Sequence, residues 1–113
     1  MPFFDLDAIQ AEYVTPKYSS AFGPLVTGEQ IEVGRLRFAA GEGSIRHAHP
    51  QEQIVVILRG RVLATLEGQT RELGPGQGFL APPNAPHEVK ALEAAEVLSC
   101  KGLVAGRGHR ITS

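Results

Sequence analysis

GEGSIRHAHPQEQIV (residues 41–55) and GQGFLAPPNAPH (residues 76–87) are the two stretches that decide the fold and the site of this chain. Together they hold three histidines and a glutamine. His47 and His49 are two residues apart, so in an extended strand both imidazoles project from the same face. Nitrogen and oxygen donors that face one interior are what a divalent transition metal ion needs. The two stretches therefore predict a metal site with these ligands: His47, His49, Gln53 and His87.

The fourth ligand can come from either of two adjacent residues, Glu52 and Gln53. Gln53 has the same parity as the two histidines before it and as Val55, so strand alternation favours Gln53. Glu52 would then point outward. The loop at Pro50 interrupts the alternation, so Glu52 remains a candidate catalytic base beside the ligands.

Composition predicts a single soluble domain and excludes several classes of protein. The chain has 113 residues, a formal net charge of −1 and one cysteine, Cys100, so no internal disulfide can form. A nearly balanced charge gives no sign of a nucleic-acid or membrane surface, and no apolar run is long enough to span a bilayer. The opening MPFFDLDAIQAEY has acids where an export signal has basic residues. We therefore expect a cytoplasmic protein.

The pattern along the chain predicts short strands after one helical turn. Asp5 or Asp7 can cap a turn over residues 6–11, with Ile9 packed inward. Glycine at position 60 and the Glu67–Gln69 segment predict two hairpins in succession, so that 53–73 would form an antiparallel meander. Such spacing indicates an all-β sandwich or barrel. The predicted strands are 31–38, 53–58, 61–66, 70–73, 79–81, 87–92 and 96–103.

The two stretches resemble the paired motifs of the cupin family. The first cupin motif has a glycine, a His-x-His pair, a glutamate and a closing glycine, and the chain places Gln where that glutamate stands. The second has Gly, Pro-x-Gly and His, followed by Asn; the chain has Asn84 for the second Gly and Ala91 for the final Asn. The matching residues are Gly41, His47, His49, Gln53, Gly60, Gly76, Pro82 and His87.

This resemblance implies a double-stranded β-helix, the jelly-roll barrel of cupins, in one domain covering 1–113. We expect an N-terminal arm over 1–28, the barrel over 29–104 and a C-terminal tail over 105–113. Barrel size rules and the resemblance together predict six to eight strands.

The His-Pro-x-Glu-Gln signature is similar to that of the pectin-degradation cupins, which convert unsaturated uronates to their linear keto forms. Those enzymes carry an Asp-x-Phe pair on the last strand, with an arginine beyond it. Here the last strand reads Ser99-Cys100-Lys101, and only Arg107 or Arg110 can supply the arginine. The resemblance therefore supports the metal cage more than the catalytic residues of that group.

Gln in place of Glu has a consequence for charge. Three neutral imidazoles and a neutral amide leave the charge of a divalent ion uncompensated, so the site should favour an anionic ligand or developing negative charge. Iron, manganese, nickel, cobalt and zinc all accept these donors. The cofactor expected is one divalent transition metal ion, and the expected partner is a small anionic molecule.

Several other residues are candidates for roles at the site. Arg35 and Arg37 share a strand face and can clamp a carboxylate if that face lines the cavity; a solvated outer face is the more common outcome. Lys101 is a cavity acid or base, or an exposed lysine, and exposure is favoured. His109 is expected to be a tail residue, and Cys100 a small buried apolar side chain.

Two classes of function follow. One is a metal-dependent enzyme that acts on a sugar acid or keto acid by isomerisation, ring opening or lyase chemistry, with an iron-dependent dioxygenase as a variant. The other is a non-catalytic cupin that binds a metal or a small molecule. A DNA-binding regulator is not expected, since no helix-turn-helix segment is present. Exposed sheet edges favour a homodimer, with the N-terminal segment pairing with the partner's sheet.

Overall fold

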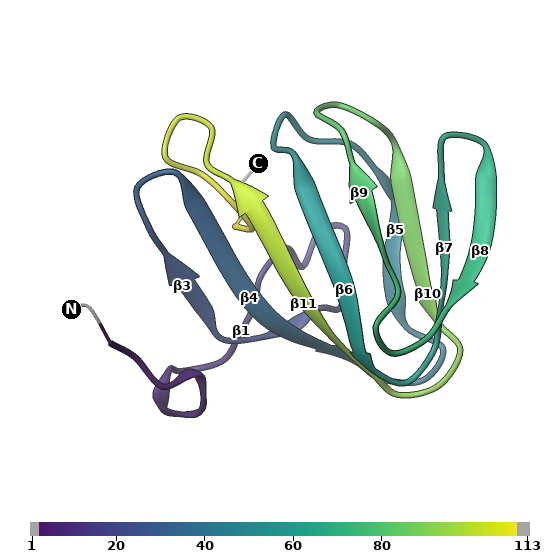
Figure 1. Cartoon of the computed structure of the whole chain (residues 1–113), viewed down its shortest axis with the longest axis horizontal. Coiled ribbons are helices and arrows are strands. Elements are labelled where there is room, and N and C mark those ends of the chain that lie inside the picture. Colours follow the sequence, from purple (N-terminus) through teal and green to yellow (C-terminus); the bar gives the residue numbers. More distant parts are fainter. Residues whose placement is uncertain (1–2, 111–113) are drawn as a thin grey trace.

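The computed structural model describes residues 3–110 and consists almost wholly of strands (Figure 1). It begins with a 3-10 turn, η1, at Leu6–Ala8, where the Asp5 carboxylate accepts a hydrogen bond from the Asp7 backbone N–H at 2.9 Å. The predicted turn is therefore present but stops short of residue 11, and Ile9 is only half-buried.

Eleven strands follow within the described residues, and they fall into two antiparallel sheets. Their bounds are β1 (Glu12–Tyr13), β2 (Phe22–Gly23), β3 (Leu25–Thr27), β4 (Ile31–Phe38), β5 (Gly43–His47), β6 (Gln53–Arg59), β7 (Val62–Leu66), β8 (Gln69–Leu73), β9 (Gly78–Ala81), β10 (His87–Ala91) and β11 (Ala95–Gly102). The larger sheet has the order β1-β2-β4-β11-β6-β9, with β3 also on β4, and the smaller has the order β5-β10-β7-β8. The prediction of an all-β jelly-roll fold is confirmed.

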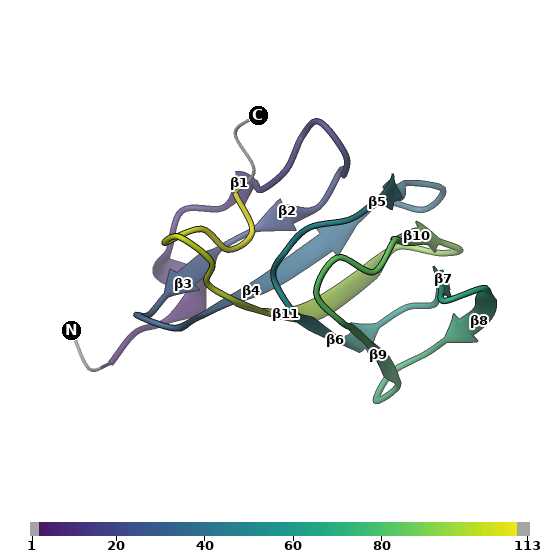
Figure 2. The ribbon, with the colours of Figure 1, turned by 90° about the horizontal axis from the view of Figure 1, so that it is seen from above.

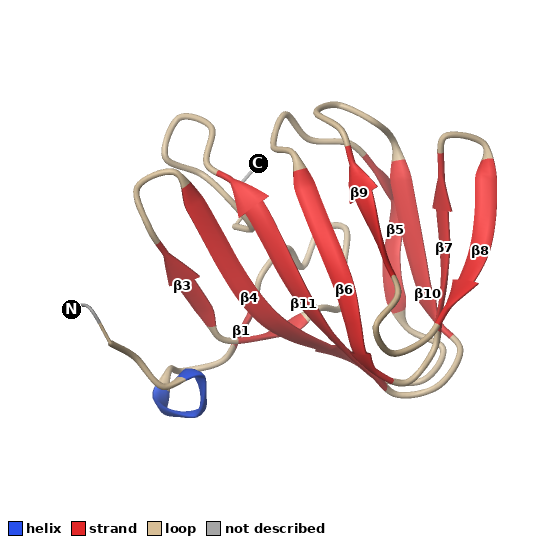
Figure 3. Ribbon diagram, in the orientation of Figure 1, coloured by secondary structure: helices blue, strands red, loops and turns tan. Residues whose placement is uncertain are grey.

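The two sheets form two layers, and the core lies between them (Figure 2). Alternate residues of each central strand point into it: Val55 and Ile57 of β6 are buried, and so are Ala95 and Val97 of β11. Burying a side chain such as Ile57 stabilises the fold by roughly 1.5–3 kcal/mol. Strands and loops account for nearly the whole chain, with η1 as the helical turn (Figure 3).

The apolar run of β6 has one buried face, although its sequence is apolar on both. Ile54 and Leu58 are 44% and 39% exposed on the outer face of the larger sheet. The unbroken apolar run of β6 therefore does not mean that both of its faces are buried: one face lies in the core, and the other is an exposed apolar surface.

The chain changes sheets at Gly60, which corrects the prediction of two successive hairpins. β7 and β8 do form a hairpin, but β6 pairs with β11 and β9, whereas β7 pairs with β10. Gly60 has a φ of 78°, and a Cβ there would lie 2.2 Å from the Ala94 carbonyl oxygen. Only glycine fits such a crossover. Asn84 likewise has a φ of 64°, which explains how it can occupy the place of the second motif glycine.

The N-terminal segment pairs with its own chain. β1 lies on β2, and β2 lies on β4, so this part of the arm extends the larger sheet. Residues 14–21 then run beside the core, with Val14 and Ala21 buried in it. Within residues 3–110 no helix has the length and apolar character needed to cross a membrane. The expected C-terminal tail is folded up to residue 110, and residues 111–113 lie outside the described part.

Candidate metal centre

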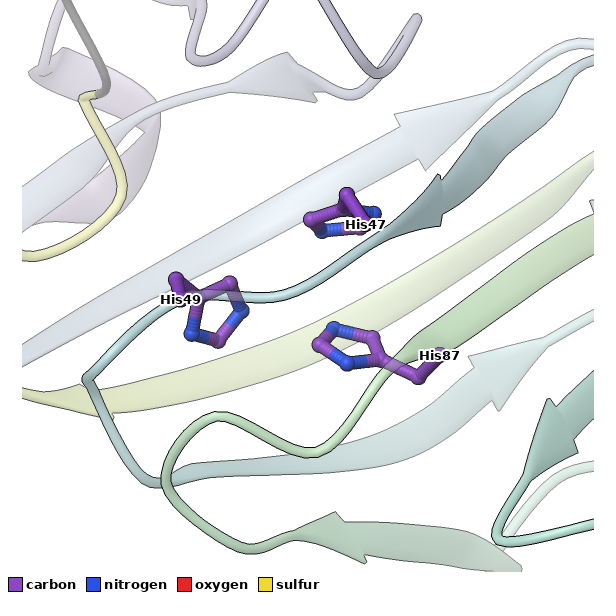
Figure 4. A group of neighbouring side chains, drawn as sticks. All are labelled: His47, His49 and His87. Atoms are coloured by element: carbon purple, nitrogen blue, oxygen red, sulfur yellow. The ribbon is translucent and has the colours of Figure 1, made fainter.

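Three histidines converge between the two sheets (Figure 4). His47 ends β5 and His87 begins β10, and the two residues are direct cross-strand partners. His49 lies in the loop that follows β5. One ring nitrogen from each lies within 4.8 Å of the other two, and the rings of His47 and His87 are 4.5 Å apart between centroids. The spacing of the two motifs therefore does bring the three predicted histidines together.

A bulge in β5 turns His47 toward the cavity. His47 pairs with His87 and Ser44 pairs with Val89, so two residues of β5 lie opposite one residue of β10. Ser44 and His47 both line the cavity because the bulge absorbs the extra residue. The bulge also frees the Ile45 carbonyl, which accepts a hydrogen bond from His47 Nδ1 at 2.7 Å.

Each of the three imidazoles is oriented in the same way by the backbone. Its Nδ1 donates to a carbonyl oxygen two residues away: His47 to Ile45 at 2.7 Å, His49 to Gln51 at 2.9 Å and His87 to Ala85 at 2.9 Å. A carbonyl oxygen can only accept, so Nδ1 carries the proton and Nε2 presents a lone pair. This is how metal-ligating histidines are held in proteins. The Asn84 backbone N–H also donates to the His49 carbonyl at 2.8 Å, which ties the two ligand loops together.

The proposed ligand atoms fit a metal ion because three of them, His87 Nε2, His49 Nε2 and Gln53 Oε1, have no hydrogen-bond donor facing them at the cage among the described residues. His87 Nε2 is buried and has no hydrogen-bond partner among residues 3–110. His49 Nε2 lies 3.2 Å from Gln53 Oε1, and with Nδ1 protonated both of these atoms are acceptors. Two facing acceptors and a buried unpartnered nitrogen are unfavourable unless a cation lies between them.

Gln53 points its amide oxygen toward the histidines. Its Nε2 donates to Ser99 Oγ at 2.9 Å, which leaves Oε1 on the side of His49. Glu52 is exposed, and its backbone carbonyl accepts a hydrogen bond from the Gly102 N–H at 3.1 Å. The structure therefore places Gln53 at the cage and Glu52 outside the cavity, which gives no support to Glu52 as a base.

Burial keeps the three imidazoles neutral. It lowers the pKa of His47 and His87, and together with the charge of Lys101 it lowers the pKa of His49 to about 4. A neutral imidazole is the form that binds a metal ion. The site is thus in its binding-ready protonation state at neutral pH.

Lys101 lies inside the cavity, which corrects the expectation that it is exposed. Its side chain is 3% exposed, and it is the cross-strand partner of Gln53. Burial lowers its pKa to about 8, while Glu32 opposes that shift. Buried Ala95, Val97 and Ser99 alternate along β11 with the same parity. That alternation was the sequence signal for an inward Lys101.

Arg35 and Arg37 lie on the outer face of β4, as favoured from the sequence, so the condition for a carboxylate clamp in the cavity is not met. Arg35 forms an ion pair with Asp7, and the Arg37 guanidinium lies 5.9 Å from the ring centroid of Phe22. The inward positions of β4 are Glu32, Leu36 and Phe38, with a parity opposite to that of the arginines.

Sequence reasoning missed three buried polar residues behind the cage. His109 is 1% exposed and contacts Glu32 and Ser99, which are 2% and 1% exposed. The predicted tail residue is thus a core residue. Glu32 could have been suspected, because a lone acid on the inward face of an alternating strand needs a partner. Nothing local marks His109, because its partner Glu32 is 77 residues away.

Two separate spaces border the histidines. The inner cavity has a volume of about 50 Å³ and is lined by His47, Gln53, His87, Ser99 and Lys101, among others. One water needs about 10–15 Å³ on this measure, so an ion and a few ligand atoms fit. A wider surface hollow of about 490 Å³ is lined by His49, Tyr18, Arg107 and Arg110. Its size is that of a small-molecule site.

Comparison with known proteins agrees with this architecture. The family profile described as "Cupin domain" matches residues 34–110. No curated protein sequence matches the chain.

Solved structures with the same fold come from several organisms. KdgF from Halomonas sp. is 26% identical, with a TM-score of 0.79, over 93% of this chain and 94% of that one. An RmlC-like cupin from Shewanella frigidimarina is 15% identical, with a TM-score of 0.82, over 93% of each chain. The polyketide cyclase RemF from Streptomyces resistomycificus is 17% identical, with a TM-score of 0.79, over 100% of this chain and 87% of that one. The last two likenesses concern the fold alone.

Proposed function

The chain belongs to the cupin domain family, and from this premise we propose that it is a metal-dependent enzyme acting on a small anionic substrate. The proposed cofactor is one divalent transition metal ion held by His47, His49, Gln53 and His87. The proposed reaction is isomerisation, ring opening or lyase chemistry on a sugar acid or keto acid.

The observation that carries the metal site is the shared orientation of the three imidazoles. Each Nδ1 is occupied by a backbone carbonyl, so three Nε2 lone pairs are left for one ion. The unpartnered Nε2 of His87 supports the same reading. Iron, manganese, nickel, cobalt and zinc all suit a donor set of three imidazoles and one amide oxygen.

Charge supports an anionic substrate. The four proposed ligands are neutral, and Lys101 adds a cation beside them. Within residues 3–110, Glu32 is the acid that acts on Lys101 through space, yet no salt bridge joins the two. The outer hollow adds Arg107 and Arg110 next to His49, although Arg110 also donates two hydrogen bonds to Glu12. A carboxylate bound in either space therefore lies close to positive charge.

The chain's own residues account for binding and proton transfer in this proposal. When bound, the metal ion would polarise a carbonyl or carboxylate oxygen and stabilise an enediolate. Lys101 holds a negatively charged oxygen of the substrate and, with a pKa of about 8, can give or take a proton near neutral pH. Tyr18 stacks on His47, with 5.6 Å between ring centroids, and covers the ring from the side of the hollow.

A non-catalytic binding protein is the second candidate, and one observation favours it. The last strand carries Ser99 and Lys101 where the pectin-degradation cupins carry an aspartate and a phenylalanine. Without that aspartate, the same cavity can bind an anion and leave it unchanged. Turnover of a uronate or keto acid separates the two candidates.

We propose a cytoplasmic homodimer. A single cysteine suits a reducing compartment. Exposed Ile54 and Leu80 are cross-strand neighbours on β6 and β9, 44% and 48% exposed, and form an apolar strip that a second copy can cover.

Elemental analysis of the purified protein tests the metal site. We expect about one transition metal ion per chain, and loss of that ion when His47 and His49 are both replaced by alanine. Glu52→Gln, which changes the neighbouring acid, is the matched control and should keep the metal. Full occupancy in the double variant would refute the site. A substrate screen of small uronates and keto acids, with and without metal, then tests catalysis.

A further inference from the structure

A chain of buried hydrogen bonds runs from Glu32 to Gln53. His109 Nδ1 lies 2.7 Å from Glu32 Oε1, and His109 Nε2 lies 2.8 Å from Ser99 Oγ. Ser99 Oγ in turn accepts from Gln53 Nε2 at 2.9 Å. Glu32, His109 and Ser99 are each at most 2% exposed. These groups are therefore shielded from water and bond mainly to one another.

The direction of the first bond follows from the other hydrogen bonds of Glu32, whose two oxygens already accept from Thr27 and from the His109 backbone. Burial would raise the pKa of this carboxyl, but hydrogen bonds from His109 and Thr27 outweigh it and lower the pKa to about 2. Glu32 is thus a carboxylate, which can only accept. It accepts from the Thr27 hydroxyl at 2.6 Å and from the His109 backbone N–H at 2.6 Å. His109 Nδ1 must therefore donate to it.

The remaining bonds then have one consistent direction. Burial lowers the pKa of His109, so its imidazole is neutral, and with Nδ1 protonated its Nε2 accepts. The Ser99 hydroxyl donates to that nitrogen, and its oxygen is left to accept from Gln53. The Gln53 amide is held with nitrogen toward Ser99 and oxygen toward His49.

We propose that Glu32, His109 and Ser99 are positioning residues that hold the oxygen end of the Gln53 amide toward the metal. This inference rests on the proposed function, in which the cage binds an ion. A glutamine has one end that can ligate and one that cannot, and rotation about its last side-chain bond exchanges them. A glutamate at the same place has two equivalent oxygens and needs no such control. The buried series of hydrogen bonds therefore has a purpose when the fourth ligand is a glutamine, because it decides which end of the amide faces the metal.

The test is a double-mutant cycle on metal affinity between Ser99 and Gln53. Zinc affinity is measured by chelator competition for wild type, Ser99→Ala, Gln53→Glu and the double variant. Groups that support a metal ligand typically change affinity 10–100-fold. We expect Ser99→Ala to weaken binding at least tenfold in the Gln53 background and less than threefold in the Gln53→Glu background. Cobalt absorption should show an altered ligand set for Ser99→Ala in the Gln53 background only.

Controls separate positioning from general damage. Ser44→Ala removes another hydroxyl that lines the cavity but does not bond Gln53, and should leave zinc affinity within threefold of wild type. Ser99→Thr keeps the hydroxyl and should restore most of the affinity. If metal-free Ser99→Ala does not unfold cooperatively, Ser99→Cys takes its place, since it keeps the volume with a weaker acceptor.

The outcomes are distinguishable. Equal losses in both backgrounds, or no loss in either, would overturn the positioning role while leaving the metal site in place. Failure of wild type to bind zinc, cobalt or any of the other candidate ions would refute the proposed function itself, and the positioning role with it.

Discussion

Lys101 and Gln53 face each other across β11 and β6, so a buried cation and the fourth proposed ligand project from neighbouring strands into one cavity. Burying a lysine next to a cation site is unfavourable, because like charges repel and burial removes water from the ammonium. Such an arrangement is stabilised when an anion enters. The pairing of Lys101 with Gln53 therefore gives the cavity a positive charge, and this charge favours anionic ligands.

Gln53→Glu tests whether the neutral amide sets that charge. The glutamate keeps an oxygen ligand but lowers the net charge of the site by one, so anions should bind more weakly. We expect about a tenfold loss in affinity for malonate, measured by titration calorimetry with metal occupancy held equal. Equal affinity in both proteins would mean that the glutamine does not tune charge.

Lys101→Met should weaken anion binding and stabilise the fold. The lysine pKa falls from 10.5 to about 8 on folding, so its charge opposes folding below pH 8, and this penalty disappears as the pH rises from about 8 to 10.5. At pH 7 the variant should gain roughly 1–3 kcal/mol in free energy of unfolding. Malonate affinity should drop at least tenfold with metal content unchanged. The exposed Lys90→Met is the matched control, and a similar effect there would contradict the assignment.

Glu32→Gln should reduce stability in a pH-dependent way. The carboxyl pKa falls from 4.5 to about 2 on folding, so its contribution is complete above pH 4.5 and is lost as the pH drops toward 2. Urea unfolding of the metal-free proteins at pH 7 should show wild type about 3 kcal/mol more stable. At pH 2 the gap should nearly close. An unchanged gap would show that the ionised carboxylate is not the cause, and exposed Glu88→Gln should show no gap at either pH.

The contrast between Gln53 and His109 shows what the sequence could predict. Gln53 was found because the local spacing of the motif and strand parity both point to it. The position of His109 near the C-terminus predicts a tail residue, and its partner Glu32 is 77 residues away, so no local pattern reveals that it is buried. Only the three-dimensional pairing of β4 with β11 brings the two residues together. Lys101 lies between these cases: β11 alternation predicts it inward, but a charged side chain in a core is rare enough to override the pattern.

Gly60→Ala should destabilise the fold far more than Gly68→Ala. Both glycines have positive φ, 78° and 74°, which costs an alanine about 1–2 kcal/mol. At Gly60 the new Cβ would also lie 2.2 Å from the Ala94 carbonyl oxygen, whereas at Gly68 nothing lies within 4 Å. Thermal unfolding should show a drop in Tm for Gly60→Ala at least twice that for Gly68→Ala. Equal drops in Tm would contradict the conclusion that the contact with the Ala94 carbonyl oxygen makes glycine necessary at position 60.

Light scattering should report about twice the chain mass of 12.1 kDa at micromolar concentration. Leu80→Lys places a charge in the proposed apolar strip and should shift the mass toward one chain. Leu92→Lys changes a leucine of similar exposure, 44% against 48% for Leu80, outside that strip and should leave the mass unchanged. A wild-type mass of one chain would contradict the dimer without affecting the fold.

The bulge in β5 constrains how many residues separate Ser44 from His47, but not which residues these are. Ile45, 62% exposed, contributes its backbone: the N–H donates to the Tyr18 carbonyl, and the carbonyl accepts from His47. Any side chain supplies the same backbone groups, so a substitution scan would find this position tolerant. Adding or removing one residue between Ser44 and His47 would change the bulge and the acceptor that His47 uses. Among related chains we therefore expect the spacing between Ser44 and His47 to be kept more strictly than the residue at position 45.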